Sequence, residues 1–206
     1  LSEVMGPGVA NECVETKDRI RSICPAALDQ VVGEVSKASA DDADRAVKTA
    51  AAKFEEWSWY PADARARIVV KAAAIMRRRV YELSAWMCYE VSKSWAEADA
   101  DIAELIDFAD YYARQALELS GPKPAIPYPD GSEDSELRYI PLGVGAIITP
   151  WNFPASIMGG MVLAAISVGN TVLVKPAETS PVIAYRFVRL LLDEAGLPPG
   201  VVNLIT

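Results

Sequence analysis

The strongest constraint on the fold is an alternation of strand-like and helix-like apolar segments after residue 143. Residues 144–149 and 171–175 have the apolar character of buried strands, and residues 155–168 between them form an apolar helix pattern. A second helix follows, and residues 201–205 predict a third strand. Strand, helix, strand, helix and strand in this order predict an α/β fold with half of a doubly wound parallel sheet.

The second helix of this unit has recognisable ends. Ser180 is expected to cap it, Pro181 to occupy its first position, and Gly196 follows its last turn. The last strand, residues 201–205, is apolar, so at the border of a sheet it would leave a bare hydrophobic edge. Complete proteins normally cover such an edge. We therefore expect the natural polypeptide to continue past this strand.

A block of helices precedes the sheet. Short extended pieces within residues 14–35 lead to a helix capped by Ser39 or Asp41. Apolar residues at three- and four-residue spacing predict this helix and three more. The first of these begins at Pro61, the second is centred on residues 83–91, and the third spans residues 97–119. Residues 1–120 thus predict amino-terminal strands and a helical layer, ahead of the sheet unit in residues 139–206.

Residues 121–138 differ from both flanking parts. Glycine, proline, serine and acidic residues dominate there, and Asp130-Gly131 is a typical turn pair. The composition supports an exposed loop, and a hairpin at this place would serve as an extended oligomerisation arm.

Composition restricts the chemistry. The chain has 206 residues, 20 basic against 28 acidic side chains, a net charge of −8 and no histidine. Without a basic stripe, nucleic-acid binding is not expected. Histidine triads and histidine-ligated metals are excluded, and no metal site is predicted. Three widely spaced cysteines and no apolar run of membrane-spanning length favour a cytoplasmic protein, with the mitochondrial matrix left open.

Two motifs follow neighbouring strands, at the sheet edge where doubly wound folds bind ligands. The first is Thr149–Pro154 and the second is Lys175–Glu178. Lys175 can donate hydrogen bonds to nucleotide hydroxyls, and Glu178 can accept them. A carboxylate beside the 2′-hydroxyl would repel a 2′-phosphate and favour NAD over NADP. The alternative is an acidic residue that merely precedes a helix.

Asn152 stands where a helix begins. Its amide could donate to a developing oxyanion, but an asparagine in this position is also a common helix cap. Trp151 and Phe153 alone would be read as core residues.

These motifs, together with Gly196–Asn203, resemble the amino-terminal part of the aldehyde dehydrogenases in order and spacing, over about Glu12 to Thr206. The resemblance implies an NAD(P)-binding domain in which Asn152 shares the oxyanion hole. Lys175 and Glu178 would meet the adenosine ribose. The remaining cofactor contacts would come from Ile148, Thr149, Pro150 and Trp151.

Within this family the segments Glu90–Ala98, Ala103–Phe108 and Tyr111–Arg114 resemble the 1-pyrroline-5-carboxylate dehydrogenases. These enzymes oxidise L-glutamate γ-semialdehyde to glutamate in proline and arginine breakdown, using NAD. The resemblance implies that Glu104 faces the ammonium group of the substrate and that Phe153 packs on its carbon chain. A helix-surface acid remains the alternative for Glu104.

The sequence also departs from the family. Ser92 replaces the more usual glycine before Lys93, and Cys24-Pro25 replaces Asn-Pro. By resemblance, the nucleophilic cysteine and the general-base glutamate lie beyond Thr206, and Cys13, Cys24 and Cys88 do not substitute. The chain would then be the front part of a dehydrogenase that is a homo-oligomer at full length, with this chain alone inactive. Other aldehyde or semialdehyde dehydrogenases, and an inactive nucleotide-binding or assembly fragment, are the alternatives.

Overall fold

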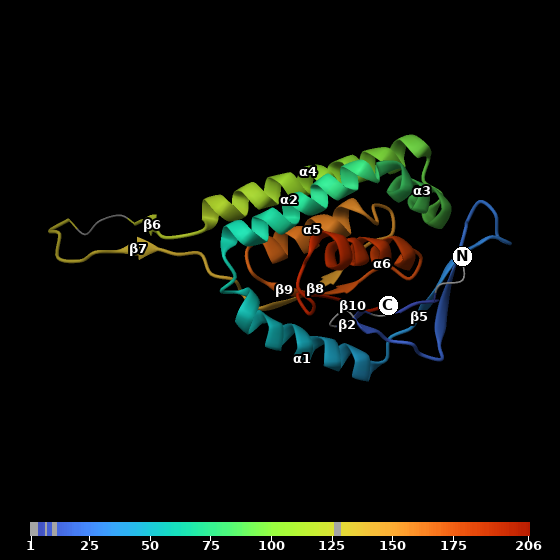
Figure 1. The fold of residues 1–206 in the computed structure, drawn as a ribbon, viewed down its shortest axis with the longest axis horizontal. Helices are drawn as coiled ribbons and strands as arrows, with labels where there is room; N and C mark the ends of the chain where they lie inside the picture. Colours follow the sequence, from blue (N-terminus) through green and yellow to red (C-terminus); the bar gives the residue numbers. More distant parts are fainter. Residues whose placement is uncertain (1–3, 7, 10–11, 126–128) are drawn as a thin grey trace.

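The computed structural model describes residues 4–6, 8–9, 12–125 and 129–206. Its centre is a sheet with the strand order β3-β2-β10-β9-β8 (Figure 1). The strands β8 (Val144–Ile148), β9 (Thr171–Lys175) and β10 (Val202–Leu204) are parallel neighbours. The predicted parallel unit is therefore confirmed.

Helices cover both faces of this sheet (Figure 1). α1 (Ala40–Trp57) lies on one face, and α5 (Ser156–Ser167) and α6 (Pro181–Arg189) lie on the other. Because apolar strand residues point to both sides, β9 and β10 are almost fully buried between the helices. A π-helical turn, η1 (Leu190–Ala195), extends α6 until Gly196 ends it with a φ of 86°.

An outer layer of helices packs on α5 and α6. It contains α2 (Ala62–Arg78), α3 (Val80–Val91) and α4 (Trp95–Leu119), which confirms the predicted helical block. Helix α4 begins before the predicted Glu97, because Ser94 and Glu97 form a reciprocal capping box. Ser39 caps α1 in the same way with Asp42.

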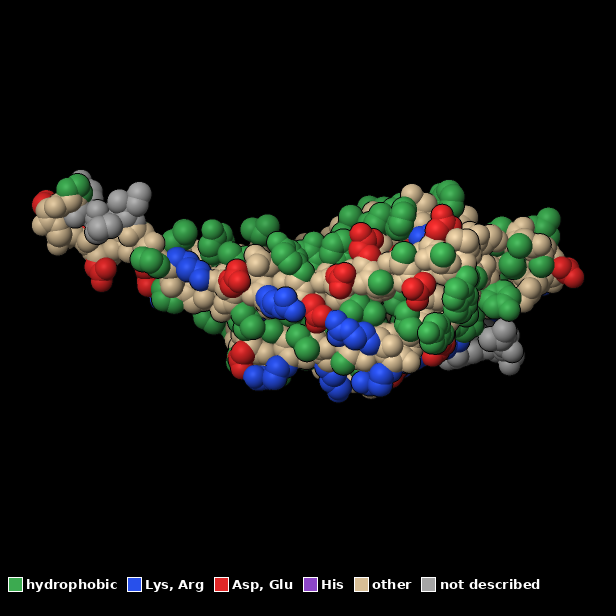
Figure 2. All heavy atoms as spheres, turned by 90° about the horizontal axis from the view of Figure 1, so that it is seen from above, with side chains coloured by type: hydrophobic (Ala, Val, Ile, Leu, Met, Phe, Trp, Pro, Cys, Tyr) green, Lys and Arg blue, Asp and Glu red, His purple; other side chains and the backbone are tan. Residues whose placement is uncertain are grey.

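Charged side chains of both signs are interspersed over the outer helices, as the face in Figure 2 shows. One such pair joins Arg77 of α2 to Asp110 of α4. Hydrophobic side chains gather along one long border of this face. Among the described residues, no helix is both long enough and apolar enough to span a membrane.

The bare edge predicted for the last strand is not present. β2 (Gly8–Val9) runs antiparallel to β10, with Gly8 opposite Leu204, and β3 (Glu12–Cys13) pairs with β2. The sequence pattern missed this because the covering strand comes from the opposite end of the chain. The structure also has a smaller sheet, with the strand order β1 (Val4–Met5), β5 (Val31–Ser36) and β4 (Arg19–Ile23).

The segment around residues 121–138 leaves the body as a two-stranded ribbon (Figure 1). β6 (Lys123–Pro124) pairs antiparallel with β7 (Glu136–Leu137). Residues 126–128 lie outside the described residues. The role of this arm in oligomerisation stays a prediction.

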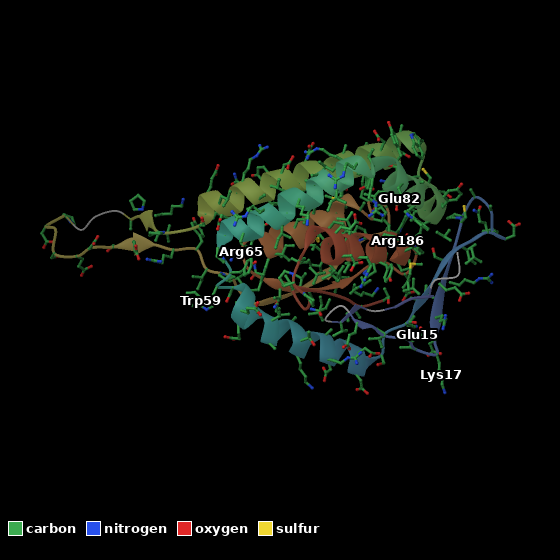
Figure 3. All side chains as sticks on the ribbon, in the orientation of Figure 1. Glu15, Lys17, Trp59, Arg65, Glu82 and Arg186 are labelled. Carbon is green, nitrogen blue, oxygen red and sulfur yellow. The ribbon has the colours of Figure 1, made fainter. Side chains whose placement is uncertain are left out.

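Arg65 joins the corner between α1 and α2 to the end of α5 (Figure 3). Its guanidinium donates to the carbonyl of Ser167 at 3.0 Å and to the carbonyl of Tyr60. Burial lowers the pKa of Arg65, and these carbonyls replace the water that burial removes.

The amino end of α6 is capped differently from the prediction. Ser180 occupies the N-cap position, but its side chain makes no capping hydrogen bond. The buried carboxylate of Glu90, from α3, accepts instead from the backbone N–H groups of Val182 at 2.7 Å and Ile183 at 2.8 Å. The oxygens of this side chain satisfy two N–H groups that the first turn of a helix leaves without a partner.

Candidate cofactor and substrate site

The two sequence motifs meet at the carboxyl ends of β8 and β9. The backbone N–H of Thr149 donates to the carbonyl of Lys175 at 3.2 Å, which continues the strand pairing one residue beyond β8. Thr149 is buried, whereas Ile148 is 72% exposed. The backbone that follows β8 is thereby fixed at the ligand-binding edge of the sheet.

Lys175 and Glu178 line one pocket of about 150 Å³. Both residues are exposed, and the Lys175 ammonium donates to the carbonyl of Pro176 at 3.1 Å. Lys37 and Ala38, which lie between β5 and α1, line the same pocket. Sequence reasoning did not find these two residues, although they lie between a strand end and a helix cap, a position typical of ligand-binding loops.

The segment 150–154 carries exposed aromatic rings. Trp151 is 57% exposed and Phe153 is 42% exposed, so their interpretation as core residues is wrong. Asn152 is also exposed, and it lies before the actual N-cap position of α5, which is Ala155. The helix-cap interpretation of Asn152 therefore does not hold, and a polar amide stands between two aromatic rings at the surface.

A buried ion pair supports this segment from the outer helices. The carboxylate of Asp101 accepts from the backbone N–H of Ser156 at 2.7 Å and from the Lys93 ammonium at 2.6 Å. The same ammonium lies 3.9 Å from the centroid of the Phe153 ring. Sequence reasoning did not single out Lys93 or Asp101. An acid and a base eight positions apart give no signal, because their role depends on a third element.

Glu104 is exposed on α4, as the helix-surface alternative also requires. It lies one turn beyond Asp101 and next to Leu105, whose side chain packs where Gly159 of α5 leaves space. Glu104 is thus placed beside the face of α4 that meets α5. Its contact with a substrate ammonium stays a prediction.

The cysteines provide no activated thiol in the described part of the chain. Cys24 is buried, and burial raises the pKa of the half-buried Cys88 thiol, the opposite of what a thiolate nucleophile needs. The side chain of Cys13 lies outside the described residues. No group of three or more metal-ligating side chains occurs among the residues that the structure describes.

The sequence model of the aldehyde dehydrogenase family matches residues 13–206. The chain belongs to the aldehyde dehydrogenase family. The family predicted from the sequence motifs and its fold are both confirmed.

Several relatives have one function in their names. The chain is 52% identical to 1-pyrroline-5-carboxylate dehydrogenases of Geobacillus kaustophilus and Anoxybacillus flavithermus, over 96% of its own length and 38% of theirs. A 1-pyrroline-5-carboxylate dehydrogenase from Thermus with bound NAD superposes with a TM-score of 0.93 at 45% identity, covering 98% of this chain and 39% of that one. A proline utilization A protein from Bdellovibrio bacteriovorus gives a TM-score of 0.94 at 39% identity, covering 100% and 21%.

This member of the aldehyde dehydrogenase family therefore spans well under half the length of the curated relatives that it matches. The resemblance to the 1-pyrroline-5-carboxylate dehydrogenase branch, predicted from the helix sequences, agrees with the names of these relatives.

Proposed function

We propose that this chain forms the amino-terminal, cofactor-binding part of an NAD-dependent dehydrogenase that oxidises L-glutamate γ-semialdehyde to glutamate. The observation that carries the proposal is the junction of β8 and β9, where the Thr149–Lys175 hydrogen bond brings both motifs to one edge. The names of the relatives, and the NAD reported with the Thermus protein, support the substrate and the cofactor.

The residues present fit an NAD adenosine ribose. Lys175 supplies a donor and Glu178 an acceptor on one pocket wall, which matches the two hydroxyls of a ribose. A carboxylate at this place disfavours a 2′-phosphate by charge repulsion, so we assign NAD rather than NADP. When bound, NAD supplies the acceptor for the hydride that leaves the substrate.

Asn152 and its neighbours would handle the substrate. The Asn152 amide donates to the oxyanion that forms when a thiolate attacks the aldehyde carbon, and such a preorganised donor typically contributes about 3 kcal/mol. Phe153 offers an apolar surface to the methylenes of the substrate. Glu104 supplies the charge that a substrate ammonium requires. Ile148, Pro150 and Trp151 border the cofactor.

The test uses the full-length gene product with glutamate γ-semialdehyde, and follows NADH formation. We expect turnover with NAD to exceed turnover with NADP. Succinate semialdehyde and acetaldehyde serve as comparison substrates. A preference for either of them over glutamate γ-semialdehyde would contradict the assigned substrate, and no turnover with any aldehyde would contradict the proposed activity.

Two variants separate the assigned roles. Asn152→Ala should lower kcat by roughly a hundredfold to a thousandfold while the Kd for NAD is unchanged, because the donor acts on the transition state. Glu178→Gln should weaken NAD binding and reduce the preference for NAD over NADP. Glu118→Gln, an exposed acid near the end of α4, is the matched control. If the Glu178 and Glu118 variants behave alike, the assigned ribose contact is wrong.

A further inference from the structure

Asp101 and Lys93 form an ion pair that is nearly inaccessible to water. The Asp101 side chain has no exposed surface, the Lys93 side chain is 11% exposed, and their charged atoms lie 2.6 Å apart. Removing two charges from water is costly, and a buried pair often stabilises a fold no better than apolar residues would. The pair therefore needs an explanation beyond general stability.

The carboxylate replaces a missing helix cap. α5 begins at Ser156, and its N-cap residue, Ala155, has no side chain able to accept a hydrogen bond. Asp101 accepts from the Ser156 N–H at 2.7 Å, and its charge lies at the positive end of the α5 dipole. The start of α5 is thus held by α4, from a different layer of the molecule.

The ammonium holds the other side of the same segment. Lys93 comes from the short connection between α3 and α4, and its Nζ lies 3.9 Å from the Phe153 ring centroid, within the range of a cation–π interaction. Phe153 is nevertheless 42% exposed. The Lys93 ammonium therefore contacts one part of the ring, and another part is accessible to a ligand.

The functional part of the proposed site is Phe153 itself and its chain neighbour Asn152. Asn152 directly precedes Phe153, which Lys93 contacts, and Phe153 lies three residues before Ser156, which Asp101 holds. A shift at Phe153 or Ser156 would therefore move the Asn152 amide as well. An oxyanion donor acts only when its nitrogen lies about 3 Å from the developing charge. Small displacements of such a donor cost large factors in rate.

We propose that Lys93 and Asp101 are a positioning pair, which fixes residues 152–156 so that the Phe153 ring faces the substrate chain and the Asn152 amide faces the oxyanion. That the Phe153 ring faces the substrate chain and the Asn152 amide the oxyanion rests on the proposed function. That Lys93 and Asp101 hold residues 152–156 rests on the two hydrogen-bond distances and the ring contact, and it can be tested without any substrate.

The first measurement is hydrogen exchange in the full-length gene product, read on the peptide that contains Ser156. In Lys93→Met and in Asp101→Asn this peptide should exchange at least about tenfold faster, the factor that corresponds to loss of one charged hydrogen bond. Lys53→Met is the matched control, because Lys53 pairs with Glu56 at the same 2.6 Å on α1, across the sheet. It should leave the Ser156 peptide unchanged.

The second measurement is steady-state kinetics with glutamate γ-semialdehyde and acetaldehyde. In Lys93→Met, KM for the longer substrate should rise roughly three- to thirtyfold, the range that extends from an exposed to a desolvated cation–π contact. KM for acetaldehyde should change little, and kcat should fall for both because Asn152 is displaced. A general loss of folding would instead lower kcat through the active fraction and leave both KM values unchanged.

Combination and rescue complete the test. The variant Lys93→Met/Asp101→Asn should lose at least about tenfold less in kcat/KM than the product of the two single losses, because each single change leaves one charge buried alone. Lys93→Arg keeps the cation and should retain more activity than Lys93→Met.

Unchanged exchange at Ser156, or multiplicative single losses, would overturn the positioning pair. If the unaltered protein oxidises no aldehyde, the proposed function fails, and the exchange measurement still decides whether the pair holds this segment.

Discussion

At the scale of single residues, buried acidic side chains cap helices that belong to other layers of the molecule. Glu90 is 2% exposed and receives three hydrogen bonds, from the Ser22 hydroxyl and from the backbone of Val182 and Ile183. Even so, burial dominates and raises the pKa of Glu90 from its ordinary value of 4.5 to about 7. This carboxyl therefore titrates near neutral pH.

Glu90 should make the stability of the chain depend on pH. Between about pH 4.5 and 7 the folded state keeps a proton that the unfolded state has released, so the contribution of Glu90 is fully present below pH 4.5 and lost as pH rises to about 7. The free energy of unfolding should decline by roughly 3 kcal/mol over this window relative to Glu90→Gln, which cannot ionise. Urea unfolding of both proteins across the window measures this. Parallel pH profiles would exclude the raised pKa.

Ser92 gives a second prediction at this scale. It ends α3 in the left-handed region, with φ 54° and ψ 34°, where a side chain is unfavourable. Ser92→Gly should raise the free energy of unfolding by about 1 kcal/mol. Ser94→Ala, two positions away, removes the α4 cap and should lower it by about 1 kcal/mol. Thermal melts of both variants test whether stability rises in Ser92→Gly and falls in Ser94→Ala. A loss of stability in the glycine variant would contradict the interpretation.

Local signals explain which residue roles the sequence could predict. Ser39 caps α1 with Asp42, three positions away, and this pattern is visible in the sequence. The caps of α5 and α6 are not visible, because Asp101 and Glu90 lie 55 and 92 positions from the N–H groups that they accept from. The sequence placed Asn152 where a helix begins, whereas α5 begins only at Ser156, and the partners that hold this segment depend on tertiary packing.

At the scale of elements, the close approach of α4 and α5 depends on glycine. A Cβ on Gly159 would lie 2.2 Å from Cδ1 of Leu105 and 3.2 Å from Cζ of Phe187. Leu105 is almost fully buried, so it has little room to move. The two helices can therefore lie this close only with glycine at position 159.

Gly159→Ala should lower the free energy of unfolding by about 1–2 kcal/mol, because the overpacking exceeds the gain of about 1 kcal/mol in helix propensity. Gly145→Ala is the comparison, since its Cβ would meet Val172 at an ordinary 3.6 Å. Denaturant unfolding of both variants tests the difference. If Gly159→Ala is the more stable of the two, the helices can separate without cost.

At the scale of the whole molecule, the element order was predictable and the sheet border was not. Strands β8, β9 and β10 follow from apolar runs between turn residues, which are local features. The strand β2 is short, and nothing near it in the sequence shows that its partner is β10. Pairing between distant segments is decided by packing that a single sequence does not display.

Removal of residues 1–11 should therefore expose the outer edge of β10 and promote self-association. Light scattering at increasing protein concentration would measure this, and the shortened chain should also melt at a lower temperature. Removal of residues 1–5 alone deletes β1 but keeps β2, and it serves as the control. Equal scattering from the two shortened chains would show that β2 does not protect the sheet.

The pairing of Gly8 with Leu204 also sets an order of events during synthesis. A ribosome adds about 5–20 residues each second, so β2 leaves it on the order of 10–40 s before its partner strand is made. The backbone hydrogen bonds of helices α1 to α4 are local and can form within this interval. A strand that is translated early is then among the last to find its partner, and chaperones would meet this edge before the sheet closes.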